Sequence, residues 1–243
     1  PSGPIVQETT DQNAPSRTYQ DLIKNKNDEI YFEHYASVEL HKISLNGSSE
    51  MIQNGMIKDF DLSPDNEFIM TKTIKKPFSY LVPYYRFPYV VDVKNMVSGT
   101  ITLIADLPLD EVRPKGFDAT RTGKRSISWR NDMGSELYWV EANDRGDPKV
   151  ITENRDIVYT LSSPFTSEKK ELLRTKLRFR NIIWGTGNEA LLGERLWKNR
   201  NDITSLIDTD SRTIVKTLFD RQYDDIYSDP GSPVLISNKF NRN

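Results

Sequence analysis

The sequence has no cysteine among its 243 residues and only two histidines. Without cysteine there can be no disulfide bond, no thiolate zinc site and no cysteine nucleophile. A run of about 18 apolar residues is also absent, so we expect no membrane-spanning helix. The 33 basic and 35 acidic residues nearly balance, so no overall field would attract nucleic acid or an anionic membrane. We therefore expect neither of these partners, and we expect no metal or cofactor.

The most informative stretch is RSISWRNDMGSELYWVEA, from Arg125 to Ala142. A short alternating run ends at Trp129 and is followed by the turn residues Asn131 to Gly134, which favour a tight reversal. The second run has four consecutive apolar residues at positions 137–140. Because side chains alternate between the two faces of a strand, this pattern predicts a strand that is covered on both sides.

Composition and periodicity divide the chain into three parts. Residues 1–16 are polar and contain three prolines, which favours a linker or a disordered insertion. Residues 17–36 have apolar residues near one helical face behind a capping-box-like Thr18, so we expect a helical insertion. The sequence Asn25-Lys26-Asn27 could split this insertion into two short helices. From residue 37 to residue 243 the hydrophobic period is two, which predicts strands.

The strand region repeats one pattern, in which an apolar strand is followed by a turn and further strands. The opening strands end at Leu62, Trp129 and Trp184. We interpret the repeats as four-stranded blades near 57–105, 125–177 and 179–219, with one more short strand in the tail after a turn at 229–231. Blades repeat every 40 to 50 residues or so, and the longer intervals here fit enlarged loops such as 106–124. The fold class we predict is all-β, a partial β-propeller of about three blades plus fragments, with a short N-terminal helical insertion.

Several longer segments also resemble a known family. The chain is similar to the middle of the β-propeller in prolyl-oligopeptidase-type serine peptidases, in the glutamyl-endopeptidase-like branch of bacteria and plant chloroplasts. The resemblance covers nearly the whole chain in the right order. It rests on PSGP (1–4), RTYQDLIKNKNDEIYFEHYAS (17–37), KPFSYLVPYYRFP (76–88), ADLPL (105–109), GKRSISWRND (123–132), LYWVEANDRGD (137–147), RDIVY (155–159) and LFDRQYDDIYSDPGS (218–232).

The resemblance implies a division of labour within a longer parent protein. In such enzymes the propeller caps a C-terminal α/β-hydrolase domain that carries the Ser, Asp and His of the triad. This sequence contains no G-x-S-x-G nucleophile elbow, so we expect no peptidase activity and no catalytic residue in this segment. The expected partners are the hydrolase domain of the same parent and peptide substrates. For a bacterial parent we expect a periplasmic or secreted location.

Basic residues crowd around the long loop, and they form the one site hypothesis that we retain. We expect Arg86, Arg121, Lys124 and Arg125 to include the residues that face the chamber and bind a substrate's acidic side chain. Arg113, Lys115 and Arg130 belong to the same cluster. The preference for glutamate that the family implies is compatible with this role. A solvated, charged loop is the alternative.

Two other classes of function compete with a peptidase segment. A stand-alone propeller-like binding or scaffold module would be followed by a stop codon instead of a hydrolase domain. A propeller glycosidase would need inward carboxylates at a defined separation, and no acidic motif favours one. On either view, an arc cut from a ring exposes the apolar faces of its terminal blades, so we also expect the isolated segment to self-associate.

Overall fold

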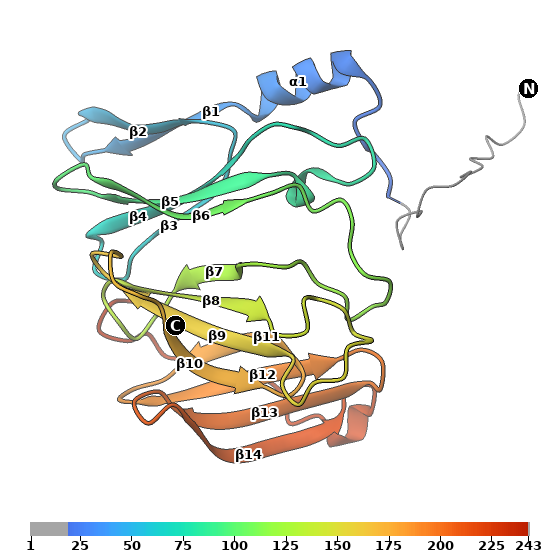
Figure 1. The fold of residues 1–243 in the computed structure, drawn as a ribbon. Helices are drawn as coiled ribbons and strands as arrows, with labels where there is room; N and C mark the ends of the chain where they lie inside the picture. Colours follow the sequence, from blue (N-terminus) through green and yellow to red (C-terminus); the bar gives the residue numbers. More distant parts are fainter. Residues whose placement is uncertain (1–18, 243) are drawn as a thin grey trace, which may run out of the picture.

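The computed structural model describes residues 19–242. The linker or insertion that we predicted for residues 1–16 lies outside this part. The described residues form three four-stranded antiparallel sheets that stack face to face, with a two-stranded hairpin and a short helix beyond the first sheet (Figure 1). The partial β-propeller predicted from the sequence is therefore confirmed.

Within each four-stranded sheet, which we call a blade, the strands follow chain order from one edge to the other. The hairpin comprises β1 (Val38–Ile43) and β2 (Ser49–Gly55). The blades comprise β3 (Ile57–Leu62), β4 (Phe68–Ile74), β5 (Tyr89–Asn95) and β6 (Ile101–Leu107), then β7 (Arg125–Trp129), β8 (Glu136–Ala142), β9 (Asp156–Ser162) and β10 (Lys170–Thr175), then β11 (Arg178–Trp184), β12 (Glu189–Leu196), β13 (Asn201–Asp208) and β14 (Thr213–Gln222).

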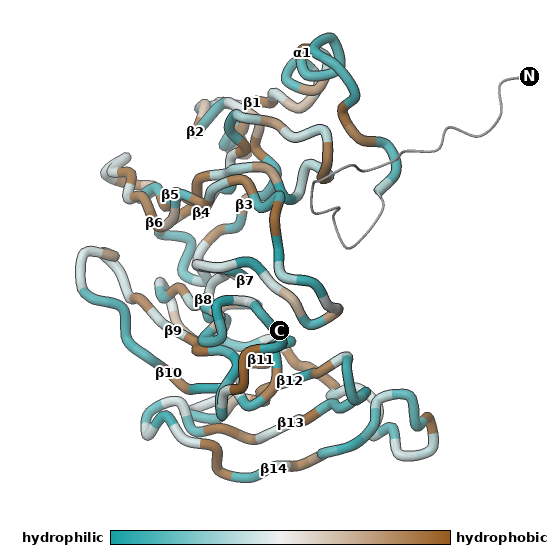
Figure 2. Tube along the Cα trace, turned by 45° about the vertical axis from the view of Figure 1, so that its right-hand side comes forward, coloured by the Kyte–Doolittle hydropathy of each residue, from teal (hydrophilic) through white to brown (hydrophobic). Residues whose placement is uncertain are grey.

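The strand β8 is buried on both faces, as its apolar run predicted. Leu137 and Trp139 belong to a core cluster that includes residues of the first blade. Val140, with Tyr138 packed beside it, belongs to a second cluster shared with the third blade. Consecutive side chains of one strand thus fill two different interfaces, which is the reason that the blades stack. In Figure 2 the apolar segments lie along the strands of the blades.

The helical insertion is one helix, not two. Helix α1 (Lys26–Ala36) begins after Asn25, whose side chain accepts hydrogen bonds from the backbone N–H groups of Asn27 and Asp28. The Asn-rich stretch therefore caps a helix instead of interrupting one, because an asparagine side chain satisfies the free N–H groups of the first turn. At 11 residues α1 is the longest helix of the described part, and no helix there could cross a membrane.

The aromatic stretch before β5 holds the helix against the first blade. Phe32 of α1 makes edge-to-face contacts with Phe78 and Phe87, at centroid distances of 5.1 and 5.6 Å. Phe78, Val82 and Phe87 are buried, whereas Tyr84, in the 3₁₀ turn η1 (Tyr84–Arg86), is 53% exposed. The stretch therefore serves packing on one side and presents aromatic rings to solvent on the other.

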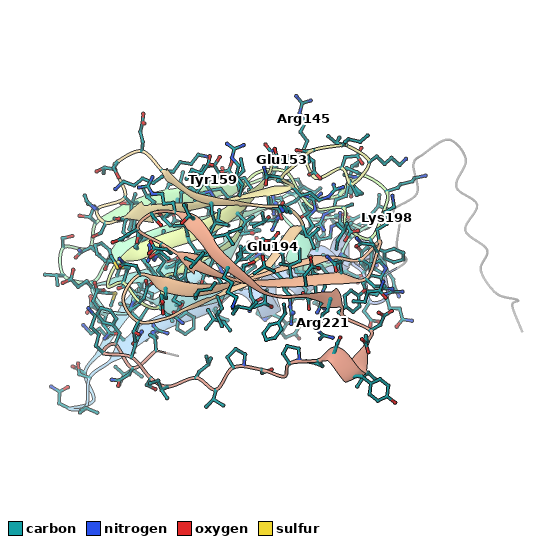
Figure 3. The ribbon with its side chains drawn as sticks, turned by 90° about the horizontal axis from the view of Figure 1, so that it is seen from below. Arg145, Glu153, Tyr159, Glu194, Lys198 and Arg221 are labelled. Atoms are coloured by element: carbon teal, nitrogen blue, oxygen red, sulfur yellow. The ribbon has the colours of Figure 1, made fainter. Side chains whose placement is uncertain are left out.

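The prediction of a short strand in the tail is wrong. After the 3₁₀ turn η2 (Ile226–Ser228), residues 229–242 contain no strand, and Val234 is 94% exposed. Side chains anchor the tail instead. Asn238 donates to the carbonyl of Asn131 at 2.5 Å, and Arg242 donates to the carbonyl of Leu62 at 2.6 Å. Figure 3 shows the tail running extended along one side of the blades, and none of the strands of the described part pairs with it.

Candidate functional site: a basic rim

The long connections of the blades gather at the side of the molecule where β3, β7 and β11 begin, and we call this side the start rim. Because the blades are antiparallel, their second and fourth strands end there. The loop of residues 108–124 crosses this rim (Figure 1). Asp118 of the loop accepts hydrogen bonds from the backbone N–H groups of Trp197 and Lys198, at 2.7 and 3.0 Å. The charged loop that connects the first blade to the second is therefore fixed to a turn of the third blade.

Glycine geometry fixes the loop at its centre. The backbone N–H of Thr120 donates to the carbonyl of Gly146 at 3.1 Å. Gly146 has φ of +78°, and a Cβ atom added there would lie 2.1 Å from the Thr120 carbonyl oxygen. A side chain is thus excluded both by the backbone conformation and by the close approach.

Arg86 and Arg113 share one buried carboxylate at this rim. Arg113 forms bidentate hydrogen bonds with Asp110, at 2.8 and 3.0 Å from its Nε. Arg86 is only 6% exposed, and its Nε lies 3.7 Å from Asp110 without a hydrogen bond to any described residue. Its Nη1 donates to the Tyr19 hydroxyl at 2.8 Å. Two guanidinium groups therefore face a single carboxylate.

Lys58 and Arg121 both lie against the ring of Tyr89. The Lys58 ammonium is 3.1 Å from the ring centroid, and the Arg121 guanidinium is 5.6 Å from it. Burial, with the positive charges of Lys72 and Arg121, lowers the pKa of Lys58 to about 8. Within residues 19–242, neither Lys58 nor Arg121 has a carboxylate in ion-pair contact. We call Lys58, Arg86, Arg113 and Arg121 the basic corner. Among the described residues, Asp110 is the one carboxylate that forms an ion pair with any of these four.

The other two candidate residues hold the blades together. Lys124 donates from Nζ to the carbonyl of Ile104 at 2.6 Å and lies 4.4 Å from the Trp139 ring centroid. Burial lowers the pKa of Lys124. Arg125 forms an ion pair with Asp156, and its side chain is 13% exposed. The structure thus brings Arg86 and Arg121 into one corner and leaves Lys124 and Arg125 with partners inside the blades. Their role toward a substrate stays a prediction.

A buried ion network beside Arg125 was not foreseen from the sequence. Asp144 and Asp156 are almost fully buried, and Arg178 bridges them at 2.7 and 3.0 Å. Arg155 adds a contact with Asp144 at 2.9 Å. This network joins the second blade to the start of the third. Lys58 was likewise missed, because a lysine in an alternating strand reads as an outward-facing residue.

An aromatic hollow of about 370 Å³ adjoins the basic corner. Phe117 and Trp197 contact each other at 5.3 Å between ring centroids, and Arg200 lies 4.3 Å from the Trp197 ring. A polar hollow of about 260 Å³, lined by Arg86 and Arg113, shares Gly116 and Phe117 with it. An apolar wall and a cationic wall thus meet at one stretch of the loop.

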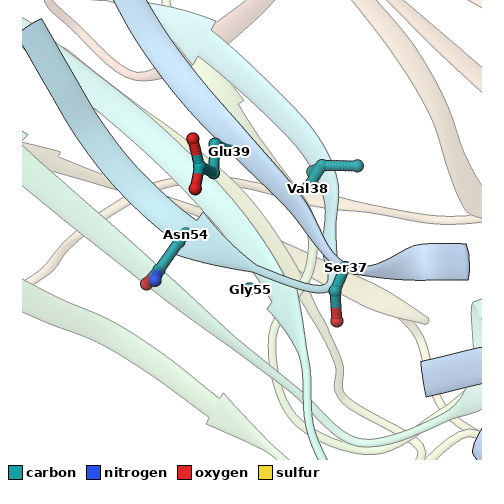
Figure 4. A pocket seen from close by; sticks show the side chains of 5 residues that line it. All are labelled: Ser37, Val38, Glu39, Asn54 and Gly55. Atoms are coloured by element: carbon teal, nitrogen blue, oxygen red, sulfur yellow. The ribbon is translucent and has the colours of Figure 1, made fainter. Parts of the chain in front are cut away.

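A further hollow lies at the hairpin, beside the end of β2 that leads into β3. Figure 4 shows Glu39 and Asn54 on the two strands that line it. Glu39 pairs with His41 at 2.9 Å, and His41 also contacts Ser49 at 2.9 Å. His41 is therefore held by its hairpin neighbours. No cluster of potential metal ligands occurs among residues 19–242.

The chain is 39% identical over 240 residues to a protein named "Probable glutamyl endopeptidase, chloroplastic" from Oryza sativa subsp. japonica, covering 97% of this chain and 26% of that protein. It is 37% identical to a protein of the same name from Arabidopsis thaliana, of which it covers 25%. The chain thus spans about a quarter of the length of these relatives.

No family model matches the chain. Among solved structures, the β-propeller domain of the Trilobed protease from Pyrococcus furiosus aligns with a TM-score of 0.42 and 13% identity, over 68% of this chain and 42% of that one. The chain is therefore a partial β-propeller. Nearly its whole length is related to about a quarter of the length of each of two proteins named as probable glutamyl endopeptidases, and the resemblance predicted from its motifs is confirmed.

Proposed function

We propose that this chain is a non-catalytic β-propeller segment of a prolyl-oligopeptidase-type serine peptidase. Its role is to gate the active site and to help position peptides for an α/β-hydrolase domain elsewhere in the parent protein. Two facts support the proposal. The known relatives named as peptidases are about four times as long as the matching region, and the sequence lacks the G-x-S-x-G elbow that such a hydrolase needs.

The observation that carries a positioning role is the charge imbalance of the basic corner. Its four cations have one ion-paired carboxylate among the described residues, Asp110. Buried or half-buried positive charge without a partner is unfavourable unless an anion approaches it. An acidic peptide side chain supplies such an anion, and a guanidinium binds a carboxylate bidentately. A preference for glutamate in the parent enzyme is consistent with this chemistry.

Substitution in the parent protein tests the proposal. Arg121→Ala should lower kcat/KM for a glutamate-containing peptide by about tenfold or more, since a charged hydrogen bond contributes about 1.5–3 kcal/mol. The same variant should leave cleavage of the matched glutamine peptide nearly unchanged. Arg174→Ala, at an exposed pair with Glu171, is the matched control. Equal losses for both peptides would contradict a role in recognising the acid.

The reading frame tests the larger statement separately. A following segment that contains a G-x-S-x-G motif between a strand and a helix supports a peptidase parent. A stop codon directly after this region would instead support a stand-alone binding or scaffold module.

A further inference from the structure

The two hollows on the start rim adjoin each other and differ in chemistry. The polar one is lined by Arg86 and Arg113 and has a volume of about 260 Å³. The aromatic one is lined by Phe117, Trp197 and Arg200 and has a volume of about 370 Å³. Gly116 and Phe117 line both. A ligand that extends past Gly116 and Phe117 can therefore contact both hollows at once.

The polar hollow has the charge to hold a carboxylate. Asp110 accepts three hydrogen bonds from Arg113 and also lies 3.7 Å from the Arg86 Nε, so one carboxylate faces two guanidinium groups. The Arg86 side chain is buried, with 6% of the residue exposed, and its Nε has no hydrogen-bond partner in the described chain. A carboxylate in this hollow would gain charge-assisted hydrogen bonds and would balance the second guanidinium.

The aromatic hollow offers a different contact. Trp197 is 41% exposed and Phe117 is 67% exposed, so these rings present apolar area to solvent. Lys198 and Arg200 flank them, and the one carboxylate in the lining, Asp118, accepts from the backbone N–H groups of Trp197 and Lys198. Figure 3 places Lys198 at one end of the blades. An apolar or aromatic side chain would bury this area, while the flanking cations favour a ligand that carries negative charge.

We propose that the two hollows together bind an extended peptide in which an acidic residue and an aromatic residue are two positions apart. In an extended chain, side chains at positions i and i+2 point to the same side. The acidic side chain enters the Arg86–Arg113 hollow, and the aromatic side chain lies against Phe117 and Trp197. This inference rests on the proposed handling of peptides, and it names the class of peptide that the segment selects.

Tryptophan fluorescence reports binding directly in this chain. The sequence has four tryptophans, and Trp129, Trp139 and Trp184 are buried. Acrylamide should therefore quench mainly Trp197. The probe is the blocked peptide Gly-Glu-Ala-Phe-Gly, together with its reversed sequence because the direction of binding is open. We expect one of the two to protect Trp197 from acrylamide at submillimolar concentration.

Peptide and protein variants separate the two contacts. Replacing Glu by Gln in the probe should weaken binding by about tenfold or more, as expected for a lost charged hydrogen bond. Arg113→Gln should do the same, because Asp110 then becomes free to neutralise Arg86. Arg174→Gln, an exposed arginine on β10, should leave the affinity unchanged. Because the peptide substitution uses the unmodified protein, the test does not depend on how a variant folds.

Three outcomes overturn the inference. They are no protection of Trp197 at millimolar peptide, equal affinity for the Glu and Gln peptides, and tighter binding of single-stranded oligothymidylate than of either peptide. The last would assign the aromatic and basic residues to nucleic acid instead. Failure here with acid-dependent cleavage by the parent intact would leave the proposed function standing, since the binding assay requires no hydrolase domain.

Discussion

Asp156 is the residue whose removal should damage the stack of blades most. It lies at the start of β9 and is fully buried. Its Oδ1 accepts from Arg178 at 3.0 Å, and its Oδ2 accepts from the backbone N–H of Phe179 at 2.7 Å. It also forms the ion pair with Arg125. One carboxylate thus connects the second blade to the third.

The substitution Asp156→Asn keeps the shape and removes the charge. An amide has one oxygen, so its NH₂ group must face one of the donors that Asp156 now accepts. At an effective dielectric constant of about 20, two charges 3 Å apart interact by about 5 kcal/mol, and desolvation offsets part of this. Removing one partner of a buried pair typically costs about 3–5 kcal/mol. We expect a loss of about 3 kcal/mol or more, a large part of an ordinary free energy of unfolding.

Urea unfolding followed by tryptophan fluorescence measures this loss. Glu171→Gln is the matched control, because it breaks a pair with Arg174 at 2.7 Å in which both side chains are more than 40% exposed. Such surface pairs contribute about 0–1 kcal/mol. If Asp156→Asn destabilised the chain by no more than Glu171→Gln, the ion network would not hold the blades together and the reasoning would be refuted.

Three further expectations follow from individual residues. Gly146→Ala should cost more than about 1 kcal/mol and expose residues 108–124 to protease, whereas Gly123→Ala, at a similar φ of +77° but with no atom within 4 Å of the added Cβ, should leave the loop protected; equal cleavage of both would refute the role of the close approach. Because the pKa of Lys58 is lowered to about 8 from its ordinary 10.5, the unfolded state binds more protons between these values, so the free energy of unfolding should rise with pH across that window. Lys58→Met should remove this rise, and an unchanged slope would count against burial of the ammonium. Val215 on β14 is 59% exposed, so we expect concentration-dependent association in light scattering that Val215→Lys weakens; a monomer at all micromolar concentrations would contradict it.

The functional proposals differ in what they require of the molecule. Gating and positioning need a parent protein with a catalytic domain, and they are tested by cleavage. Binding of an acidic and aromatic peptide requires only the start rim of this chain. Cleavage by the parent and peptide binding by this chain are measured separately, so the two experiments tell a failure of one proposal from a failure of the other.

The sequence by itself determined the strands and their grouping into blades. The run at positions 137–140 required burial on both faces, and the structure divides those residues between two core clusters. The turn residues at each reversal fixed the hairpins. These features are local, because periodicity and turn preference depend on neighbours within a few positions. The helix start and the tail strand show the limit of such reasoning. An asparagine-rich stretch can either interrupt a helix or cap one. An apolar run forms a strand only where another strand pairs with it.

Only the tertiary structure decided which basic residues form a site. Arg121 and Arg125 are close in sequence, yet Arg125 pairs with Asp156 inside the blades, whereas Arg121 lies with Lys58 around Tyr89. The sequence counts charges but not their partners. A guanidinium is neutralised or left free according to which carboxylates the fold brings within about 4 Å, and those carboxylates come from distant strands.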